Sequence, residues 1–149
     1  MNKEIERKFL IEEFDESCTS ERYDIIQGYI HSGDGKVVRV RTFGEKAYIT
    51  IKYRIGNISR AEFEYEIPYD DALNMINNCC DNKVLKKTRF IYYHCNKKWE
   101  IDVFKGKNHG LILGEIELSS ENEEFEIPSF IVKEVTNDKK YSNHILASK

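Results

Sequence analysis

The chain has 149 residues, 33% of them charged, and its 23 Lys and Arg against 26 Asp and Glu give a formal net charge of -3. This length predicts one domain over residues 1–149, and the near balance of charge excludes both a protein that coats nucleic acid and an acidic tail protein. No apolar run approaches the ~18 residues that a membrane span needs, and the first residues do not resemble a signal peptide, so we expect a soluble, cytoplasmic protein.

Alternation of apolar and polar residues predicts a mainly β (α+β) fold with eight strands. We expect these strands at residues 3–11, 23–31, 36–43, 46–54, 60–67, 85–95, 99–104 and 111–118. Residues 69–78, after Pro68, are expected to form a short helix, and residues 138–146 a C-terminal helix. Eight strands in meander order, joined by short turns, predict an antiparallel sheet that can close into a barrel.

The cysteines and histidines do not indicate a metal centre. The four cysteines (Cys18, Cys79, Cys80 and Cys95) contain no C-x-x-C pair, and the four histidines form no H-E-x-x-H motif. We therefore expect free thiols, no zinc site and no catalytic triad built on histidine.

Charged residues alternate with apolar residues in seven of the predicted strands. In 38–41, for example, two arginines share one face of the strand opposite two valines. A sheet with one face in water is the simplest interpretation. Pairs of arginines and pairs of glutamates at the strand centres favour a second one, a barrel with a charged interior. The basic residues of this pattern are Lys8, Arg39, Arg41, Lys52, Lys87 and Arg89. The acidic residues are Glu4, Glu6, Glu62, Glu64, Glu100, Asp102, Glu115 and Glu117.

Such an interior has a recognisable ligand chemistry. Arginine and lysine side chains match the oxygens of a polyphosphate, and carboxylates are the ligands that hard divalent cations prefer. Charges in a narrow, dry interior cost several kcal/mol each unless counter-charges and water accompany them. A triphosphate of roughly -4 to -5 with two Mg²⁺ ions adds almost no net charge, so this pair of ligands fits the interior.

The sequence resembles the CYTH superfamily, the triphosphate tunnel metalloenzymes, and in particular its short bacterial members, the inorganic triphosphatases. The family's N-terminal E-x-E-x-K motif stands here as 4–8. The resemblance extends over almost the whole chain through the segments 27–29, 38–41, 50–52, 60–67, 87–89, 99–104, 114–118 and 134–136. Membership implies an eight-stranded antiparallel barrel that forms a hydrophilic tunnel, with helices packed outside and Mg²⁺ or Mn²⁺ as cofactor, two ions in our expectation.

The resemblance also implies roles for individual residues. The metal-facing carboxylates are Glu4, Glu6, Asp102, Glu115 and Glu117. The triphosphate-binding residues are Lys8, Arg39, Arg41, Lys52, Lys87, Arg89 and Lys133, the last of which is expected to close one tunnel end. Glu62, Glu64 and Glu100 are expected to orient the bases or hold water, and Tyr29 is either a tunnel-wall residue or ordinary sheet packing. Lys8 or Lys52 would take part in catalysis by positioning the water or the leaving group.

The leading functional hypothesis is metal-dependent hydrolysis of inorganic tripolyphosphate, with nucleoside triphosphates as further substrates. A class IV adenylyl cyclase, which makes cyclic AMP and pyrophosphate, is the second. A non-enzymatic sensor of polyphosphate or nucleotide is the third. We expect a small-molecule triphosphate as partner, no nucleic acid and no membrane. Monomer and homodimer both stay open, because apolar residues on the outer face such as Phe63 and Tyr65 permit a dimer but fit helix packing equally well.

Overall fold

The computed structural model describes residues 2–149 and is built mainly of β-strands. The strands are β1 (Lys3–Ile11), β2 (Arg22–Gly33), β3 (Lys36–Phe43), β4 (Lys46–Arg54), β5 (Ser59–Ile67), β6 (Val84–His94), β7 (Lys97–Lys105), β8 (Ile112–Glu117) and β9 (Ile131–Glu134). The chain also forms two α-helices, α1 (Tyr69–Asn78) and α2 (Asn143–Ala147). Three short 3₁₀ helices lie at Glu16–Cys18, Gly106–Asn108 and Lys139–Tyr141.

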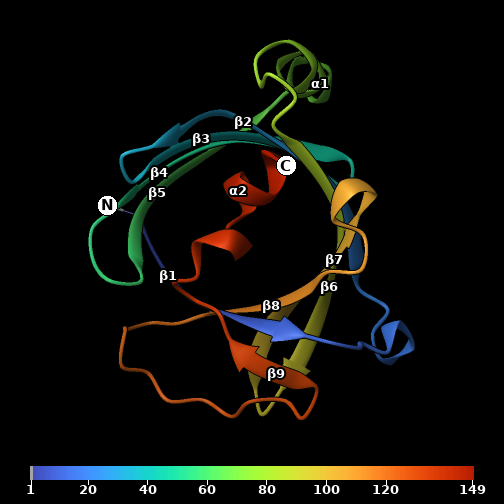
Figure 1. The fold of residues 1–149 in the computed structure, drawn as a ribbon, viewed down its shortest axis with the longest axis vertical. Helices are drawn as coiled ribbons and strands as arrows, with labels where there is room; N and C mark the ends of the chain where they lie inside the picture. The colour runs from blue at the N-terminus through green and yellow to red at the C-terminus, as the bar shows by residue number, and fades with distance from the viewer. Residues whose placement is uncertain (1) are drawn as a thin grey trace.

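Strands β1 to β8 close into one antiparallel barrel (Figure 1), which confirms the predicted fold class. Around the ring the order is β1-β5-β4-β3-β2-β6-β7-β8, and β8 returns to β1. The expected single meander was therefore wrong. The chain forms two meanders, β2 to β5 and β6 to β8, which join through β2 and β6. Closure removes the free edges that an open sheet would leave.

Strand β1 is the seam of the barrel. One of its edges pairs with β8 from Glu6 to Ile11, and its other edge pairs first with β5 and then with β9. The sequence analysis did not predict β9, since its four residues are too few to show an alternating pattern. β9 brings the last part of the chain alongside the barrel.

The two helices lie on opposite sides of the barrel wall (Figure 1). Helix α1 begins after Pro68 with two acidic residues, which favour a helix N-terminus, and buries Ala72 and Ile76 against the outer face of β3 and β4. Helix α2 lies inside the ring, where Leu146 packs in a buried cluster with Tyr29 and Phe104. The expectation that the helices pack outside thus holds for α1 and is wrong for α2. The reason is that the interior is apolar at this end of the barrel.

A third buried cluster covers the outside of β1, β7 and β8. The rings of Phe9 and Trp99 pack at a tilt with their centroids 5.4 Å apart, and Phe125 of the long connection after β8 packs on both. The four cysteines are free thiols, as expected. Within residues 2–149, the helices are all too short or too polar to cross a membrane.

Replacing Gly28 by alanine is expected to loosen the attachment of α1. A Cβ atom at Gly28 would lie 2.6 Å from the Sγ atom of buried Cys80, which follows α1, so one of the two must shift. Overpacking of this kind costs about 1–3 kcal/mol of unfolding free energy. Urea denaturation of Gly28→Ala measures it, and the double variant with Cys80→Ala is expected to recover most of the loss. Equal stability of Gly28→Ala and the parent would contradict this packing.

Candidate functional site

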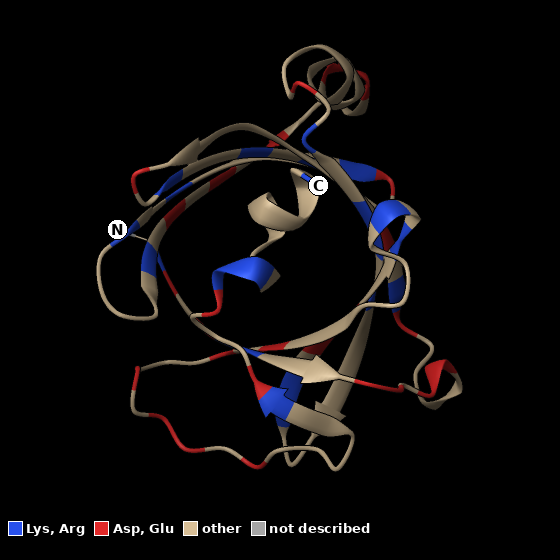
Figure 2. Ribbon diagram, viewed as in Figure 1, with Lys and Arg blue, Asp and Glu red and all other residues tan. Residues whose placement is uncertain are grey.

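The barrel encloses a cavity of about 1000 Å³, and its wall is dense in charge. Side chains alternate across a strand, so the odd or even positions of each strand turn inward together. Figure 2 shows acidic and basic residues distributed along the strands around the ring. The charged lining residues of the barrel strands are Glu4, Glu6, Lys8, Lys36, Arg39, Arg41, Lys52, Arg54, Arg60, Glu62, Glu64, Lys87, Arg89, Glu100, Glu115 and Glu117. The structure thus brings together most of the residues that the alternating pattern singled out.

Strands β3 and β6 form the basic side of the cavity. Burial, followed by repulsion from Arg39 and Arg89, lowers the pKa of Arg41 to about 10. The Nε atoms of Arg39 and Arg41 are buried without a hydrogen-bond partner among the described residues. Only Glu64 bridges these two arginines, at 3.3 and 3.4 Å, while it accepts a hydrogen bond of 2.7 Å from Thr50 Oγ1. Unmet donors and mutual repulsion together favour a bound anion.

Strands β1 and β8 form the acidic side. Burial opposes ionisation of Glu4, but Lys52 and Arg60 outweigh it and lower the pKa of Glu4 to about 2. The pKa of Glu115 is also lowered, because Lys8 and Arg89 outweigh its burial. Burial, reinforced by repulsion from Glu115 and Glu4, instead raises the pKa of Glu6 to about 8. Glu4 and Glu115 are thus ionised at neutral pH, whereas Glu6 is mostly protonated although Arg60 reaches it at 3.2 Å.

This acidic side fits a divalent cation in its donor chemistry. Carboxylate oxygens are the ligands of hard cations, and the raised pKa of Glu6 shows that Lys52 and Arg60 do not offset its burial and the repulsion from Glu115 and Glu4. Among residues 2–149, however, no three carboxylate, histidine or cysteine side chains stand together in an arrangement that could hold a metal ion. Glu4 is instead occupied by Lys52, at 2.9 Å, and by Arg60, also at 2.9 Å. A metal ion would therefore have to displace these two bases from Glu4.

Lys8 and Lys52, the two expected catalytic residues, both line the cavity. Lys8 Nζ donates a 3.0 Å hydrogen bond to the carbonyl oxygen of Tyr141 and lies 3.8 Å from Glu115. Lys52 Nζ sits between Glu4 and Glu62, the latter at 3.4 Å. Both ammonium groups are almost fully buried, so their charges act in a medium where water screens them little.

For Asp102 the structure corrects the expected role. Asp102 is 0% exposed and does not line the cavity. Its Oδ1 accepts a hydrogen bond of 2.8 Å from Arg89 Nε, and its Oδ2 accepts one of 2.9 Å from Arg89 Nη2 and one of 2.7 Å from Lys87 Nζ. With both oxygens occupied, Asp102 holds the two bases in place rather than facing a metal ion. Glu100, which also accepts from Arg89, lines the cavity.

Lys133 is the second correction. It lies on β9 opposite Leu10, is exposed, and is not among the residues that line the cavity. Residues of the segment 136–145, which includes most of the expected C-terminal helix, line the cavity instead. Asn108 Nδ2 ties this segment down by donating to the carbonyl oxygen of Leu146 at 3.1 Å. Tyr29 is a wall residue, and its hydroxyl accepts a 2.8 Å hydrogen bond from Gln27.

Several contributors to the cavity were missed, among them Arg54, Arg60 and His144. Arg60 reaches Glu4 at 2.9 Å and Glu6 at 3.2 Å. The alternation of residues 60–67 would have identified Arg60, because it lies two residues before Glu62 on the same face of the strand. His144 lines the cavity from α2 and has its pKa lowered by burial and by the nearby Arg60 and Lys8. No local sequence signal indicates that a C-terminal helix turns inward.

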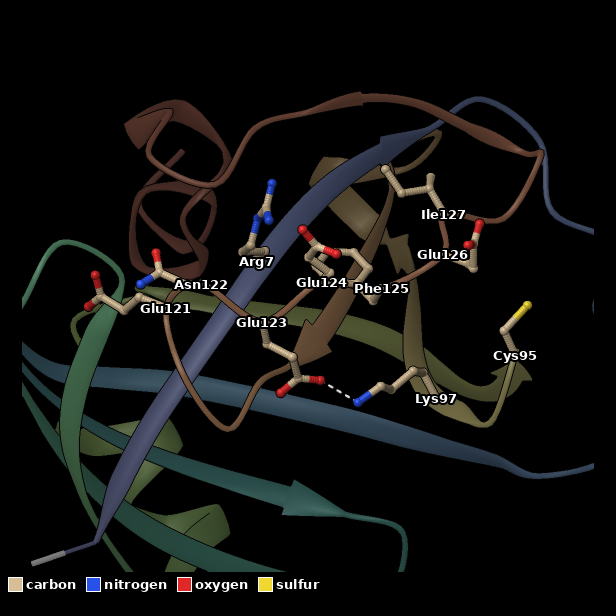
Figure 3. Close-up of a pocket in the computed structure, with 10 residues that line it drawn as sticks. All are labelled: Arg7, Cys95, Lys97, Glu121, Asn122, Glu123, Glu124, Phe125, Glu126 and Ile127. Atoms are coloured by element: carbon tan, nitrogen blue, oxygen red, sulfur yellow. Dashed lines mark hydrogen bonds and ion pairs between the residues drawn. The ribbon is translucent and has the colours of Figure 1, made fainter.

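A second hollow of about 750 Å³ lies outside the barrel, between β1 and the connection after β8 (Figure 3). Its lining includes Glu121, Glu123, Glu124 and Glu126, and Lys97 is held by Glu123. Arg7, at its inner side, lies over the ring of Phe125 at 5.1 Å. This acidic lining repels anions, so the polyanion chemistry belongs to the barrel interior.

A closed antiparallel barrel with a basic and an acidic side facing one cavity defines the class of charged-tunnel proteins. Residues 2–148 match the family model of the CYTH domain. The chain therefore belongs to the CYTH family.

Curated relatives cover nearly the whole chain. An inorganic triphosphatase of Acetivibrio thermocellus is 41% identical over 143 residues, which span 96% of this chain and 92% of the relative. An inorganic triphosphatase of Nitrosomonas europaea is 32% identical over 148 residues, or 97% of this chain and 96% of the relative. The crystal structure of the inorganic triphosphatase NE1496 superposes with a TM-score of 0.70 at 30% identity and covers 100% of this chain and 97% of that one.

Proposed function

We propose that this protein hydrolyses inorganic tripolyphosphate in the barrel cavity, with the help of a divalent metal ion. The observation that carries the proposal is the pair of repelling, incompletely bonded arginines, Arg39 and Arg41, facing an acidic side on which the pKa of Glu6 is raised. A triphosphate and its counter-ion would satisfy both at once. The names of the two curated relatives support the same substrate.

The residues of the basic side would bind and orient the triphosphate. Arg39 and Arg41 present several N–H donors each, and Arg89 is fixed in place by Asp102. These donors are positioned before the substrate arrives, so they neutralise charge that spreads over the phosphoryl oxygens without reorganising. Lys8 and Lys52 would position the attacking water or the leaving phosphate, because both line the cavity with their ammonium groups beside carboxylates of the acidic side.

Glu4, Glu6, Glu115 and Glu117 are the residues that would hold Mg²⁺ or Mn²⁺. When bound, such an ion supplies charge neutralisation and an acidified water molecule. Glu6 would give up its proton on binding the ion, because a ligating carboxylate must be deprotonated and the pKa of Glu6 is raised to about 8.

Product analysis tests the proposal. Purified protein is incubated with either tripolyphosphate or ATP in the presence of Mg²⁺ or Mn²⁺. The products of each reaction are then identified. We expect orthophosphate from tripolyphosphate. The rate of hydrolysis should fall about 10²-fold or more in Glu4→Gln and in Lys8→Ala. Lys86→Ala is the matched control, because Lys86 is exposed on β6 beside buried Lys87 and points away from the cavity.

The alternatives give different products. Orthophosphate from ATP as well would establish nucleoside triphosphates as further substrates. Cyclic AMP with pyrophosphate would replace the proposal by an adenylyl cyclase. Tight binding of tripolyphosphate, with no product formed in the presence of either Mg²⁺ or Mn²⁺, would identify a sensor. It would overturn the proposal of a hydrolase.

A further inference from the structure

The outer face of β4 and β5 carries no charged side chain. Lys52 and Glu62 line the interior, so the residues that alternate with them turn outward. The outward positions of the two strands are Ala47, Ile49, Ile51, Tyr53, Ala61, Phe63, Tyr65 and Ile67. An antiparallel sheet with one face in water ordinarily carries polar side chains on that face. This face therefore has the composition of a buried surface.

Only part of the face is covered within the described chain. Helix α1 packs over the end that holds Ala47, Ile49 and Ile67, and no other described helix lies over β4 and β5 (Figure 1). At the uncovered end Tyr65 is 62% exposed, and Ile51 44%. Tyr53, Phe63 and the adjoining Ile55 extend the same patch. A contiguous exposed patch of this kind is a candidate interaction site.

The two ends of this patch carry opposite charges. Lys3 and Lys36 lie in one cross-strand row with Ala61 and Tyr53, at the end where β4 finishes. Asp70 and Asp71 follow β5 at the other end, in the first turn of α1.

All four charged side chains are free to meet a partner. Lys3, Lys36, Asp70 and Asp71 are exposed, and within residues 2–149 none of them takes part in an ion pair. The surface is thus apolar in the middle, basic at one end and acidic at the other.

We propose that this surface, formed by β3, β4 and β5 with the start of α1, binds a second copy of the same chain. A two-fold axis across the strands places the two apolar patches face to face and the basic end of each copy against the acidic end of the other. The basic end and the acidic end of each copy then both pair with opposite charge, and the two pairings are related by the two-fold axis, as in a self-complementary interface.

Sedimentation velocity with tens of micromolar protein tests the association. We expect twice the mass of the 17.6 kDa chain for the parent and the mass of one chain for Tyr65→Glu. Tyr93→Glu is the matched control, because Tyr93 is 64% exposed on β6, away from the patch, and this variant is expected to stay dimeric. A parent that sediments as one chain overturns the proposal, and so does dissociation by Tyr93→Glu but not by Tyr65→Glu.

Charge reversal tests the orientation without touching the apolar patch. Asp70→Lys with Asp71→Lys is expected to raise the dimer dissociation constant at least tenfold. Adding Lys3→Glu and Lys36→Glu to the same chain should restore the parent value, because each end then meets its opposite again. If the combined variant stays as weak as the first, the antiparallel arrangement is overturned. Hydrolysis is not used as a readout, so this result is independent of the proposed function.

Discussion

Glu6→Gln is expected to make the metal-free protein more stable and to abolish most of its activity. Burial, followed by repulsion from Glu115 and Glu4, raises the pKa of Glu6 to about 8 from an ordinary 4.5, and the nearby Lys52 and Arg60 do not offset this. The folded state therefore binds this proton more tightly than the unfolded state does. Between pH 4.5 and 8 the unfolded state loses it first, so stability falls as the pH rises. The penalty reaches about 3 kcal/mol near neutral pH, and an uncharged amide removes it.

Urea denaturation in the presence of a chelator measures this effect at pH 5 and pH 7.5. The two proteins should differ little at pH 5, and the variant should be the more stable one at pH 7.5. Its hydrolysis of tripolyphosphate should fall about 10²-fold, because one proposed metal ligand is lost. Glu66→Gln, an exposed glutamate on β5, serves as the control and should change neither quantity. A pH-independent difference between the two proteins would mean that the pKa of Glu6 is not raised.

The largest loss of stability is expected from Asp102. Asp102→Ala removes the carboxylate that holds Lys87 and Arg89 while both bases stay buried. Uncompensated buried charges of this kind cost about 3–5 kcal/mol. Asp102→Asn keeps the shape but not the charge and should lose a comparable amount. We also expect weaker binding of tripolyphosphate, since Arg89 loses the partner that fixes its guanidinium group.

Thermal and urea unfolding measure the cost, and Asp24→Asn is the matched control. Asp24 is an exposed aspartate whose Oδ1 accepts from Thr88 Oγ1, a contact that an asparagine can keep, so its change should stay within about 0.5 kcal/mol. The double variant of Asp102→Asn with Lys87→Met should recover part of the loss, because one of the two stranded charges is gone. Additive losses in the double variant would argue against this coupling.

Local structure was predictable wherever alternation is regular. The bounds of β1, β3, β4 and α1 agree with the expectation residue for residue, and those of β2, β5 and β6 differ by one or two residues at an end. The order of strands around the barrel was not predictable in the same way. It depends on which edges meet after folding, and side-chain alternation within a strand carries no information on its neighbours.

The features of the site were likewise predictable where they depend on alternation within a strand, and unpredictable where they depend on contacts between strands. Alternation identified nearly all inward-facing charges, because it reports which face a side chain occupies. It could not distinguish Glu100, which lines the cavity, from Asp102 two residues later on the same face. That difference arises from the reach of Arg89 and Lys87 across two strands. The inward position of α2 depends likewise on apolar residues from four strands, among them Leu85 and Leu113, that become neighbours only in the barrel.

The place of β1 in the ring has a consequence for the order of folding. β1 is the first strand to be synthesised, yet from Glu6 to Ile11 its partner is β8, about a hundred residues later. The β2–β5 meander can form early from neighbouring segments, whereas β1 waits with an unpaired edge until β8 has left the ribosome. Such distant pairing makes folding slow and leaves strand edges open to other chains in the meantime. Nascent chains should therefore engage chaperones through β1 until β8 arrives.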